Sequence, residues 1–376
     1  MTMTLSAHAP YGRTHRDAAA PHEPAPVRPA LVGVGTAVPP TSYSQQEILD
    51  IFGVSDAKIR SVFLNSAIQR RHLTLPPGAD RGRPQEETQG DLLRKHTRQG
   101  VDMGVRALRE CLAASGHELS DLAYLCCVST TGLITPGLSA LLIKELGLRT
   151  DTSRLDVVGM GCNAGLNGLN AVAGWSTANP GRLAVMVCVE VCSAAYVFDG
   201  TMRTSVVNSL FGDGAAAVAV VTGADGAAPA GPRLRKFASC IIPEASGAMR
   251  YDWDETAGKY SFFLDREVPY VVGAHAEGVV DRLLAGTGLR RSDIAHWVVH
   301  SGGKKVIDSV RMNLGLTRHD VRHTVSVLRD YGNLSSGSFL FSYQRLSDED
   351  RVRPGEHGVF MTMGPGSTIE TALLQF

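Results

Sequence analysis

Two almost wholly apolar runs, at residues 183–191 and 215–221, restrict the fold of this chain more than any other feature. Neither run alternates between apolar and polar residues, so both faces of each expected strand are buried. Shorter strand-like and helical runs alternate before them, with expected strands at 122–128 and 155–158 and expected helices at 138–146 and 164–175. This alternation predicts an α/β fold in which helices cover both faces of a mostly parallel sheet.

The second half of the chain repeats this alternation. We expect helices at 270–286, 304–314 and 339–346, a strand that ends at His300 and a last strand at about 368–375. Gly, Ala and Pro dominate residues 223–232, as is typical of a connection between domains. We therefore expect a flexible tail at 1–28, a first half at 29–225 and a second half at 226–376. The two halves are expected to be related as a duplicated α/β unit.

The charge balance and the cysteines exclude several classes of protein. Lys+Arg and Asp+Glu both number 37, and a chain without net charge lacks the cationic surface that nucleic-acid binding requires. The seven cysteines include no CxxC pair and no Cys/His cluster with zinc spacing, so we expect no metal site and a reducing, cytoplasmic compartment. No run of 18 apolar residues predicts a membrane span, and residues 1–28 lack the apolar segment of a signal peptide.

Cys162 is the first candidate for chemistry, in the turn at residues 159–165 that joins an expected strand to an expected helix. The free N–H groups at a helix N-terminus favour a thiolate, which is the reactive form of cysteine, so we expect a lowered pKa. A buried structural cysteine in a Gly-rich turn is an equally good interpretation of this segment alone. The spacing GxGxxxG does not match the dinucleotide-binding fingerprint GxGxxG.

His300 and Asn333 are the next candidates. His300 ends an expected parallel strand and precedes Gly302 and Gly303, at the sheet edge where α/β proteins place ligands. Asn333, in a Gly- and Ser-rich segment at 331–338, carries an amide that can donate to a developing oxyanion. A hydrogen-bonded histidine at a strand end and a simple turn or N-cap asparagine remain the alternatives.

Two further segments could shape a cavity. Phe211 precedes Gly-Asp-Gly and could form the wall of an entrance or belong to the core. Pro365 lies in a Gly-Pro-Gly turn, which is rigid enough to border a cavity but is also an ordinary loop.

Five segments together are far more specific than any one of them. They are GMGCNAG at 159–165, LFGDGAAA at 210–217, HSGGK at 300–304, YGNLSSG at 331–337 and MGPGSTIE at 363–370. In this order and spacing they resemble the thiolase-fold condensing enzymes, and within those the type III polyketide synthases, the chalcone synthase-like family. The resemblance extends from about residue 30 to the end of the chain.

The resemblance implies a thiolase-like fold of two duplicated halves in a five-layered αβαβα arrangement, a homodimer, and coenzyme A thioesters as substrates. It implies a catalytic triad of Cys162, His300 and Asn333, and no metal or redox cofactor. It also implies two gatekeeper aromatics, Phe211 and Phe262, with Phe263 left open as the second one. Further residues implied at the cavity are Glu190, with a structural role favoured over proton transfer, and Pro365.

For coenzyme A, the resemblance implies contacts to the pantetheine arm and to the phosphates. The residues expected at these contacts are Lys58, Gly302, Gly303 and Lys305, with Arg60 as a substitute for basic residues that are missing from the same helix. Ser61 and Asn65 stand where the plant enzymes have basic residues, so the phosphate contacts differ from the plant pattern. Small residues at 192–195 follow Glu190, which indicates a reshaped cavity and a product other than a chalcone.

The implied reaction is the decarboxylative condensation of malonyl-CoA on Cys162, with His300 and Asn333 stabilising the enolate. Runs such as FLNSAIQRRHLTLPP and RDYGNLSSGSFLFS resemble a bacterial branch that serves antibiotic biosynthesis more than the plant enzymes. That branch implies four malonyl-CoA, an aromatic product and accessory proteins similar to enoyl-CoA hydratases. Priming by malonyl-CoA or by acetyl-CoA stays open. The alternatives are another aromatic product, a ketoacyl synthase III-like enzyme and a non-catalytic acyl-CoA-binding module.

Overall fold

The computed structural model describes residues 28–224 and 229–376. The expected tail at 1–28 therefore lies, except for its last residue, outside the described residues. The expected boundary between the halves, at 225 and 226, lies within the second gap at 225–228 and so outside the described residues. No helix in the described part of the chain is long and apolar enough to cross a membrane.

The main sheet of the described residues consists of nine strands, five from the first half and four from the second. In spatial order they are β11 (Ile294–Val299), β12 (His357–Gly364), β13 (Thr368–Gln375), β8 (Arg233–Ile241), β1 (Ala30–Ala37), β7 (Gly214–Val221), β6 (Leu183–Glu190), β4 (Leu122–Ser129) and β5 (Ser153–Val158). β1 and β8 pair only at Ala30 and Arg233, so the two parts of the sheet diverge from that single junction.

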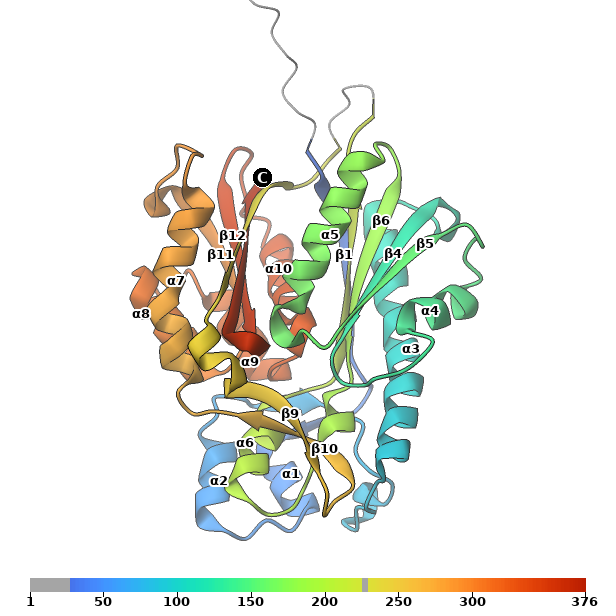
Figure 1. The fold of residues 1–376 in the computed structure, drawn as a ribbon, viewed down its shortest axis with the longest axis vertical. Helices are drawn as coiled ribbons and strands as arrows, with labels where there is room; N and C mark the ends of the chain where they lie inside the picture. The colour runs from blue at the N-terminus through green and yellow to red at the C-terminus, as the bar shows by residue number, and fades with distance from the viewer. Residues whose placement is uncertain (1–27, 225–228) are drawn as a thin grey trace, which may run out of the picture.

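Helices separate the two parts of the sheet and cover their outer faces (Figure 1). The inner layer consists of α5 (Ala164–Ala178) and α10 (Ser338–Asp348), which contact strands of both parts. The outer layers consist of α3 (Gln89–Ser115) and α4 (Leu138–Leu146) on one side, and α7 (Val268–Leu284) and α8 (Lys304–Leu314) on the other. Helix, sheet, helix, sheet and helix follow one another, which confirms the expected five-layered αβαβα architecture.

The expectation of a mostly parallel sheet was wrong. β4 pairs in parallel with β5 and β6, and β11 with β12, but β7 is antiparallel to both β6 and β1, and β13 is antiparallel to both β12 and β8. The apolar run of β7 is buried on both faces because helices cover both sides of the sheet. Burial on two faces follows from the layers and does not determine strand direction.

A smaller layer covers the end of the sheets where β4, β6 and β11 finish (Figure 1). It contains α1 (Gln45–Ile51), α2 (Ala57–Leu64), α6 (Met202–Leu210), α9 (Arg322–Tyr331), the short pair β2 (Ser42–Ser44) and β3 (Arg70–His72), and the hairpin β9 (Met249–Asp254) and β10 (Lys259–Leu264). The sequence analysis did not predict the hairpin, whose strands are only six residues long. This layer encloses the space beyond the strand ends.

Arg71, on β3, is buried completely at the centre of this layer. Its Nη1 donates to the carbonyl oxygens of Asn208 and Phe211 at 2.6 and 2.7 Å, and to the Tyr196 hydroxyl at 2.8 Å. Its Nη2 donates to Gln45 at 2.7 Å. One guanidinium therefore satisfies acceptors from several loops and holds the backbone at Phe211 in place.

We expect Arg71→Ala to lower the free energy of unfolding by about 4 kcal/mol, because the substitution leaves several buried acceptors without a donor. Denaturant unfolding followed by circular dichroism measures this loss. The neighbouring Arg70 is a matched control, since its side chain is half exposed and bonds only Ser42 and Glu47. Arg70→Ala should cost about 1 kcal/mol or less; equal losses in the two variants would contradict the role of Arg71.

Candidate active site

Cys162 lies in a short 3₁₀ turn, η3 (Gly161–Asn163), between β5 and the first residue of α5. Its side chain is almost buried, with 7% exposure. Gly161 adopts φ = +75°, and a Cβ at this position would come within 2.1 Å of the Pro365 ring. The turn thus requires glycine both for its backbone conformation and for the close approach of Pro365, which fixes the direction of Cys162.

His300 follows the last residue of β11, and its backbone N–H donates to the Met361 carbonyl of β12 at 2.8 Å. The side chain is 2% exposed. Its Nδ1 is fully buried and has no hydrogen-bond partner among the described residues, whereas Nε2 is left to face the cavity that His300 lines. Nε2 is therefore the ring nitrogen that can exchange a proton or a hydrogen bond with a bound molecule.

Asn333 follows α9, and its amide is held in one orientation. Its Oδ1 accepts from the Ser335 backbone N–H at 2.8 Å and lies 3.4 Å from the Ser338 hydroxyl. The amide nitrogen is thereby left as the free donor, and the Asn333 side chain acts to lower the pKa of the Cys162 thiol. In this orientation the Asn333 amide N–H group can donate to an oxyanion that forms on a substrate beside Cys162.

Cys162, His300 and Asn333 line one cavity of about 660 Å³. A second cavity, of about 340 Å³, begins on the other side of Cys162, and the two share only Cys162, Phe211, Met249 and Phe262. The rings of Phe211 and Phe262 meet edge to face with centroids 5.8 Å apart. The structure therefore places these two aromatics at the boundary between an outer and an inner cavity.

Phe263, the alternative for the second gatekeeper, points away from both cavities. Residues next to one another on a strand face opposite sides, and the Phe263 ring packs under the guanidinium of Arg250 at 4.3 Å. Phe262 is the residue of this pair that the cavities contact. The gate role remains a prediction, and only the position of Phe262 fits it.

Burial governs the ionisation of the candidate pair. It raises the pKa of the Cys162 thiol to about 12, although hydrogen bonds from Ser335 and Asn333 act in the opposite direction. It lowers the pKa of His300 to about 3. The expected low pKa of the thiol is thus absent in the resting site, where both groups are neutral. Transfer of the thiol proton to His300 leaves the net charge of the site unchanged and yields the reactive thiolate.

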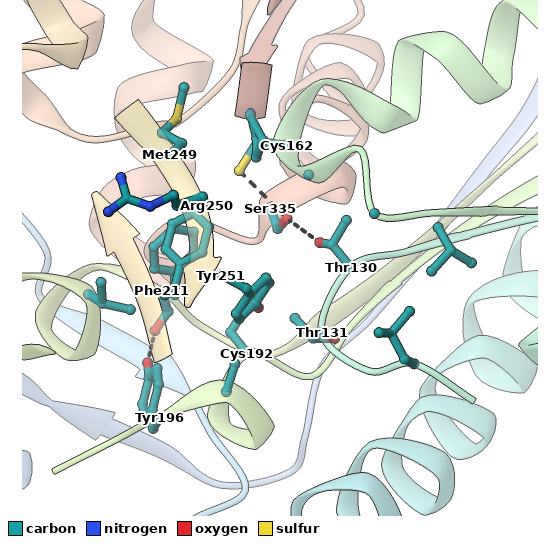
Figure 2. A pocket seen from close by; sticks show the side chains of 18 residues that line it. Thr130, Thr131, Cys162, Cys192, Tyr196, Phe211, Met249, Arg250, Tyr251 and Ser335 are labelled. Atoms are coloured by element: carbon teal, nitrogen blue, oxygen red, sulfur yellow. Dashed lines mark hydrogen bonds between the residues drawn. The ribbon is translucent and has the colours of Figure 1, made fainter. Parts of the chain in front are cut away.

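Glu190, at the end of β6, is completely buried. It accepts from the Thr130 backbone N–H at 3.1 Å and from the Ser336 hydroxyl at 2.5 Å. A row of side chains connects it with the nucleophile: the Cys162 Sγ lies 3.6 Å from the Ser335 hydroxyl, which lies 3.4 Å from the Thr130 hydroxyl (Figure 2). Burial raises the pKa of Glu190 above its usual range, against the hydrogen bonds from Ser336 and Thr130.

The residues expected to bind coenzyme A divide into two groups. Gly302, Gly303 and Lys305 line the outer cavity. Neither Lys58 nor Arg60 lines it, but Lys58 lies on the same face of α2 as Ser61, Val62 and Asn65, which do. The Arg60 guanidinium donates instead to the Val54 carbonyl at 3.0 Å and to Gln46 at 3.1 Å, so the structure does not bring it to the cavity.

The sequence analysis missed several residues that line the inner cavity, chiefly Thr130, Tyr251 and Ser335. Ser335 lies two residues after Asn333 within the YGNLSSG segment, and Thr130 follows β4 at the edge where Cys162 and Glu190 also lie. The sequence positions of Ser335 and Thr130 could therefore have identified both as candidate site residues. Nothing in the sequence marked Tyr251, because its hairpin was not predicted. Among residues 28–224 and 229–376, no three His, Cys, Asp or Glu side chains lie close enough together to hold a metal ion.

Comparisons with known proteins agree over almost the whole chain. The family model of the chalcone and stilbene synthase N-terminal domain matches residues 22–226, and that of the C-terminal domain matches residues 233–376. The chain is 69% identical to the 3,5-dihydroxyphenylacetyl-CoA synthase of Streptomyces toyocaensis, over 94% of this chain and 91% of that protein. It is also 69% identical to the synthase of the same name from Amycolatopsis orientalis, over 92% and 93% of the two chains.

A solved structure gives the same result for the fold. The chain resembles 1,3,6,8-tetrahydroxynaphthalene synthase from Streptomyces coelicolor, a bacterial type III polyketide synthase, with a TM-score of 0.83 and 27% sequence identity. The match covers 92% of this chain and 99% of that one.

The neutral resting pair predicts how Cys162 responds to pH. In the wild type, His300 can accept the thiol proton, so alkylation by iodoacetamide should proceed at neutral pH. In His300→Ala the proton must leave to solvent, and because burial raises the pKa of Cys162, the thiolate fraction grows only as the pH rises through the alkaline range. We expect alkylation at neutral pH to slow about 100-fold. Mass spectrometry of the Cys162 peptide measures it; the same pH profile in both proteins would contradict the proton transfer.

Proposed function

Because the chain belongs to the chalcone and stilbene synthase family, the type III polyketide synthases, we propose that it condenses four malonyl-CoA into 3,5-dihydroxyphenylacetyl-CoA. The observation that carries this proposal is the placement of a thiol, an imidazole and an amide donor in one cavity that adjoins a second, mainly apolar cavity at Cys162. The identity of 69% to two synthases that bear this product's name supports the product.

The reaction begins with acyl transfer to Cys162. His300 takes the thiol proton, and the thiolate attacks the thioester carbonyl of an acyl-CoA in the outer cavity. The bond between the carbonyl carbon and the coenzyme A sulfur breaks, and coenzyme A leaves as the thiol after it receives the proton from His300. The acyl group is then held as a thioester of Cys162.

The next malonyl-CoA loses its carboxylate as carbon dioxide, and the electron pair of the broken bond forms an enolate of the remaining acetyl-CoA unit. His300 Nε2 and the Asn333 amide nitrogen can both donate to the enolate oxygen, because each is the free donor of its side chain. For His300 this requires the neutral ring, which its low pKa favours, in the tautomer that carries the proton on Nε2. The ring reaches this tautomer by proton exchange with solvent after coenzyme A has left. One such donor contributes about 3 kcal/mol to the transition state.

The enolate carbon attacks the acyl-Cys162 carbonyl and breaks its bond to sulfur, which leaves as thiolate. Each cycle thus converts one acyl group and one malonyl-CoA into a β-ketoacyl-CoA that is longer by two carbons, plus carbon dioxide. Return of this chain to Cys162 releases coenzyme A. One malonyl-CoA serves as starter after loss of its carboxyl group, and three condensations give an eight-carbon tetraketide.

Ring closure requires an intermediate that is protected from water. The inner cavity is lined mainly by apolar groups, and the Phe211 and Phe262 rings stand at its entrance. An aldol reaction of the tetraketide forms the ring, and loss of water makes it aromatic. Exclusion of bulk water prevents hydrolysis of the thioester in the meantime.

Coenzyme A is proposed to lie along the outer cavity. Gly302 and Gly303 allow the pantetheine arm to approach the backbone before α8, while Lys305 meets the phosphates. Arg266 and Lys304 also line this cavity and add positive charge that α2 lacks at Ser61 and Asn65. Lys58, one turn earlier on the same face of α2, is placed to reach the outermost phosphate.

We assign the protein as a homodimer, as the family resemblance implies. β5 is the last strand of the sheet, so its outer edge has no partner among the described strands. The apolar residues Leu133, Val158 and Met160 beside it are 66%, 44% and 38% exposed, and the first two border the inner cavity. A second copy related by a two-fold axis would cover this edge and close that side of the cavity.

Two further assignments complete the proposal. All seven cysteines are free thiols, which suits a reducing compartment, so we place the enzyme in the cytoplasm. Proteins similar to enoyl-CoA hydratases are the accessory partners that the same branch of the family implies, within the biosynthesis of vancomycin-type antibiotics.

Incubation of the purified protein with malonyl-CoA alone tests the function. We expect 3,5-dihydroxyphenylacetyl-CoA by mass spectrometry, with carbon dioxide and coenzyme A released. Cys162→Ala should abolish the product, whereas Cys240→Ala, which changes a partly exposed cysteine outside the cavities, should retain it. Absence of an eight-carbon product from the wild type, or full activity of Cys162→Ala, would refute the proposal.

Asn333→Ala separates the two roles within the triad. Decarboxylation of malonyl-CoA should fall about 100-fold, because the variant loses one donor to the enolate oxygen. Alkylation of Cys162 should change much less, since His300 still accepts the thiol proton. Equal losses of both would show that Asn333 has a structural role only.

The proposed coenzyme A contacts predict different effects on KM when each of three basic side chains is removed. Lys305→Ala and Lys58→Ala should each raise KM for malonyl-CoA about tenfold, because each removes one charge-assisted contact to phosphate. Arg60→Ala should leave KM within about twofold, since its guanidinium bonds elsewhere. Steady-state kinetics measures these values, and a larger rise for Arg60→Ala than for Lys305→Ala would overturn the assignment.

A further inference from the structure

His96 is a buried histidine on α3 that none of the steps above uses. Its side chain has no exposed surface, and burial lowers its pKa to about 4, so the imidazole is neutral. The ring lies against the segment that follows β4, where a Cβ at Gly132 would come within 2.4 Å of the His96 Cδ2. His96 therefore packs directly against backbone that borders the inner cavity.

Among the described residues, the His96 ring has a single hydrogen-bond partner, Thr131. The Nδ1 atom lies 3.2 Å from the Thr131 hydroxyl oxygen, and the same oxygen accepts from the Val191 backbone N–H at 2.9 Å. Nε2 is buried without a partner in the described part of the chain. A side chain that only fills space needs no nitrogen, and an unpaired buried nitrogen costs stability, so the Nδ1 contact is the reason for a histidine here.

The position of the ring proton follows from these contacts. If the Thr131 hydroxyl donated to Nδ1, the neutral ring would carry its proton on Nε2, as a buried N–H group without an acceptor. Orphaned N–H groups are rarer in proteins than orphaned acceptors, so the proton is on Nδ1 and His96 donates to Thr131. Both lone pairs of the Thr131 oxygen are then used, by His96 and Val191, and the hydroxyl hydrogen is left for another acceptor.

Thr131 lines the inner cavity, so a bound molecule can be that acceptor. Figure 2 shows Thr131 on the side of the cavity across from Cys162. The neighbouring Thr130 hydroxyl differs, because it already donates to the Glu190 carboxyl group at 3.1 Å. Thr131 therefore offers a hydrogen-bond donor to the part of an acyl chain that lies away from the nucleophile.

Closure of the proposed tetraketide requires a donor at that end. In a phenylacetyl product the thioester carbon and its neighbour lie outside the ring, so the new bond joins the last carbon of the chain to the keto carbon nearest the thioester. The last carbon attacks as the enolate of the keto group beside it, and the negative charge lies on that keto oxygen, where a donor stabilises it. The proton that the last carbon loses ends on the oxygen of the attacked keto group, which later leaves as water.

We propose that the Thr131 hydroxyl donates to the far keto oxygen of the polyketide, and that His96 is the positioning residue that directs this hydroxyl into the cavity. The inference rests on the proposed function, because it assumes a tetraketide in the inner cavity. His96 and Val191 hold the Thr131 oxygen from two sides, which fixes the direction of its hydrogen. A chain without this contact closes on its own enol oxygen: that oxygen attacks the thioester carbonyl, coenzyme A leaves as the thiol with the enol proton, and a lactone forms.

The test measures the ratio of 3,5-dihydroxyphenylacetyl-CoA to free lactone by mass spectrometry, after incubation with malonyl-CoA alone. Thr131→Val keeps the shape of threonine without the hydroxyl and should lower this ratio about tenfold, whereas Thr131→Ser should keep it. His96→Leu should lower the ratio about fivefold, because the hydroxyl remains but its direction is no longer fixed. The double variant His96→Leu/Thr131→Val should match Thr131→Val, since both changes remove the same contact.

A matched pair of amides tests the positioning role. The asparagine amide is attached to Cγ, as Nδ1 is, so His96→Asn returns a donor to the Nδ1 position and should bring the ratio to within about twofold of the wild type. The glutamine amide lies one carbon farther out, near the Nε2 position, so His96→Gln should resemble His96→Leu. His275→Leu is the control, because His275 is exposed on α7 and lines neither cavity. Its ratio should equal that of the wild type.

The outcomes separate the two proposals. If the wild type makes no eight-carbon product from malonyl-CoA, the proposed function fails. If the wild type makes it and Thr131→Val keeps the wild-type ratio, the function stands and the role of Thr131 is overturned. Equal ratios for His96→Asn and His96→Gln, with only the total turnover reduced, would overturn the role of His96. Circular dichroism checks the folding of each variant, and the amide pair decides even if His96→Leu does not fold.

Discussion

The buried guanidinium of Arg71 is the interaction on which the geometry of the site depends most. It binds the backbone carbonyl of Phe211, and the segment at Phe211 forms a backbone bridge with Asn333. Gly332, just before Asn333, lies so close to the Arg71 side chain that a Cβ there would come within 2.9 Å of it. A single buried cation thereby connects Phe211 to Asn333, which come from different halves of the chain.

The layers explain why those halves must meet. Cys162 comes from the first half, whereas His300 and Asn333 come from the second, and neither half contains all three groups. Their strands finish at the same end of the molecule (Figure 1), where the hairpin and the short helices enclose the cavities. Enclosure also has an electrostatic effect, because it keeps both Cys162 and His300 neutral at rest. The proposed reactivity of Cys162 therefore requires a proton to move from its thiol to His300 and does not use a stable ion pair.

Much of the site could be predicted from local segments. Each candidate residue of the triad, Cys162, His300 and Asn333, lies in a Gly-rich segment next to the end of a strand or helix. Gly161 has a positive φ and lies against the Pro365 ring, and only glycine meets both conditions. Arg60 shows the limit of such prediction, because its guanidinium bonds Val54 and Gln46 and not the cavity. A basic residue at a plausible spacing says nothing about which face of the helix the ligand will occupy.

The sequence by itself determined the α/β class and, through its motifs, the family, and it supplied the candidate site residues. These features depend on local patterns of apolar, small and reactive residues. Only the tertiary structure decided the antiparallel direction of β7, the choice of Phe262 over Phe263 and the contact of His96 with Thr131. Each of these depends on which segments pack together across long separations in the chain. No local pattern encodes such packing. The spacing of apolar residues indicates which side of a helix or strand is buried, but it does not indicate which other segment packs against that side.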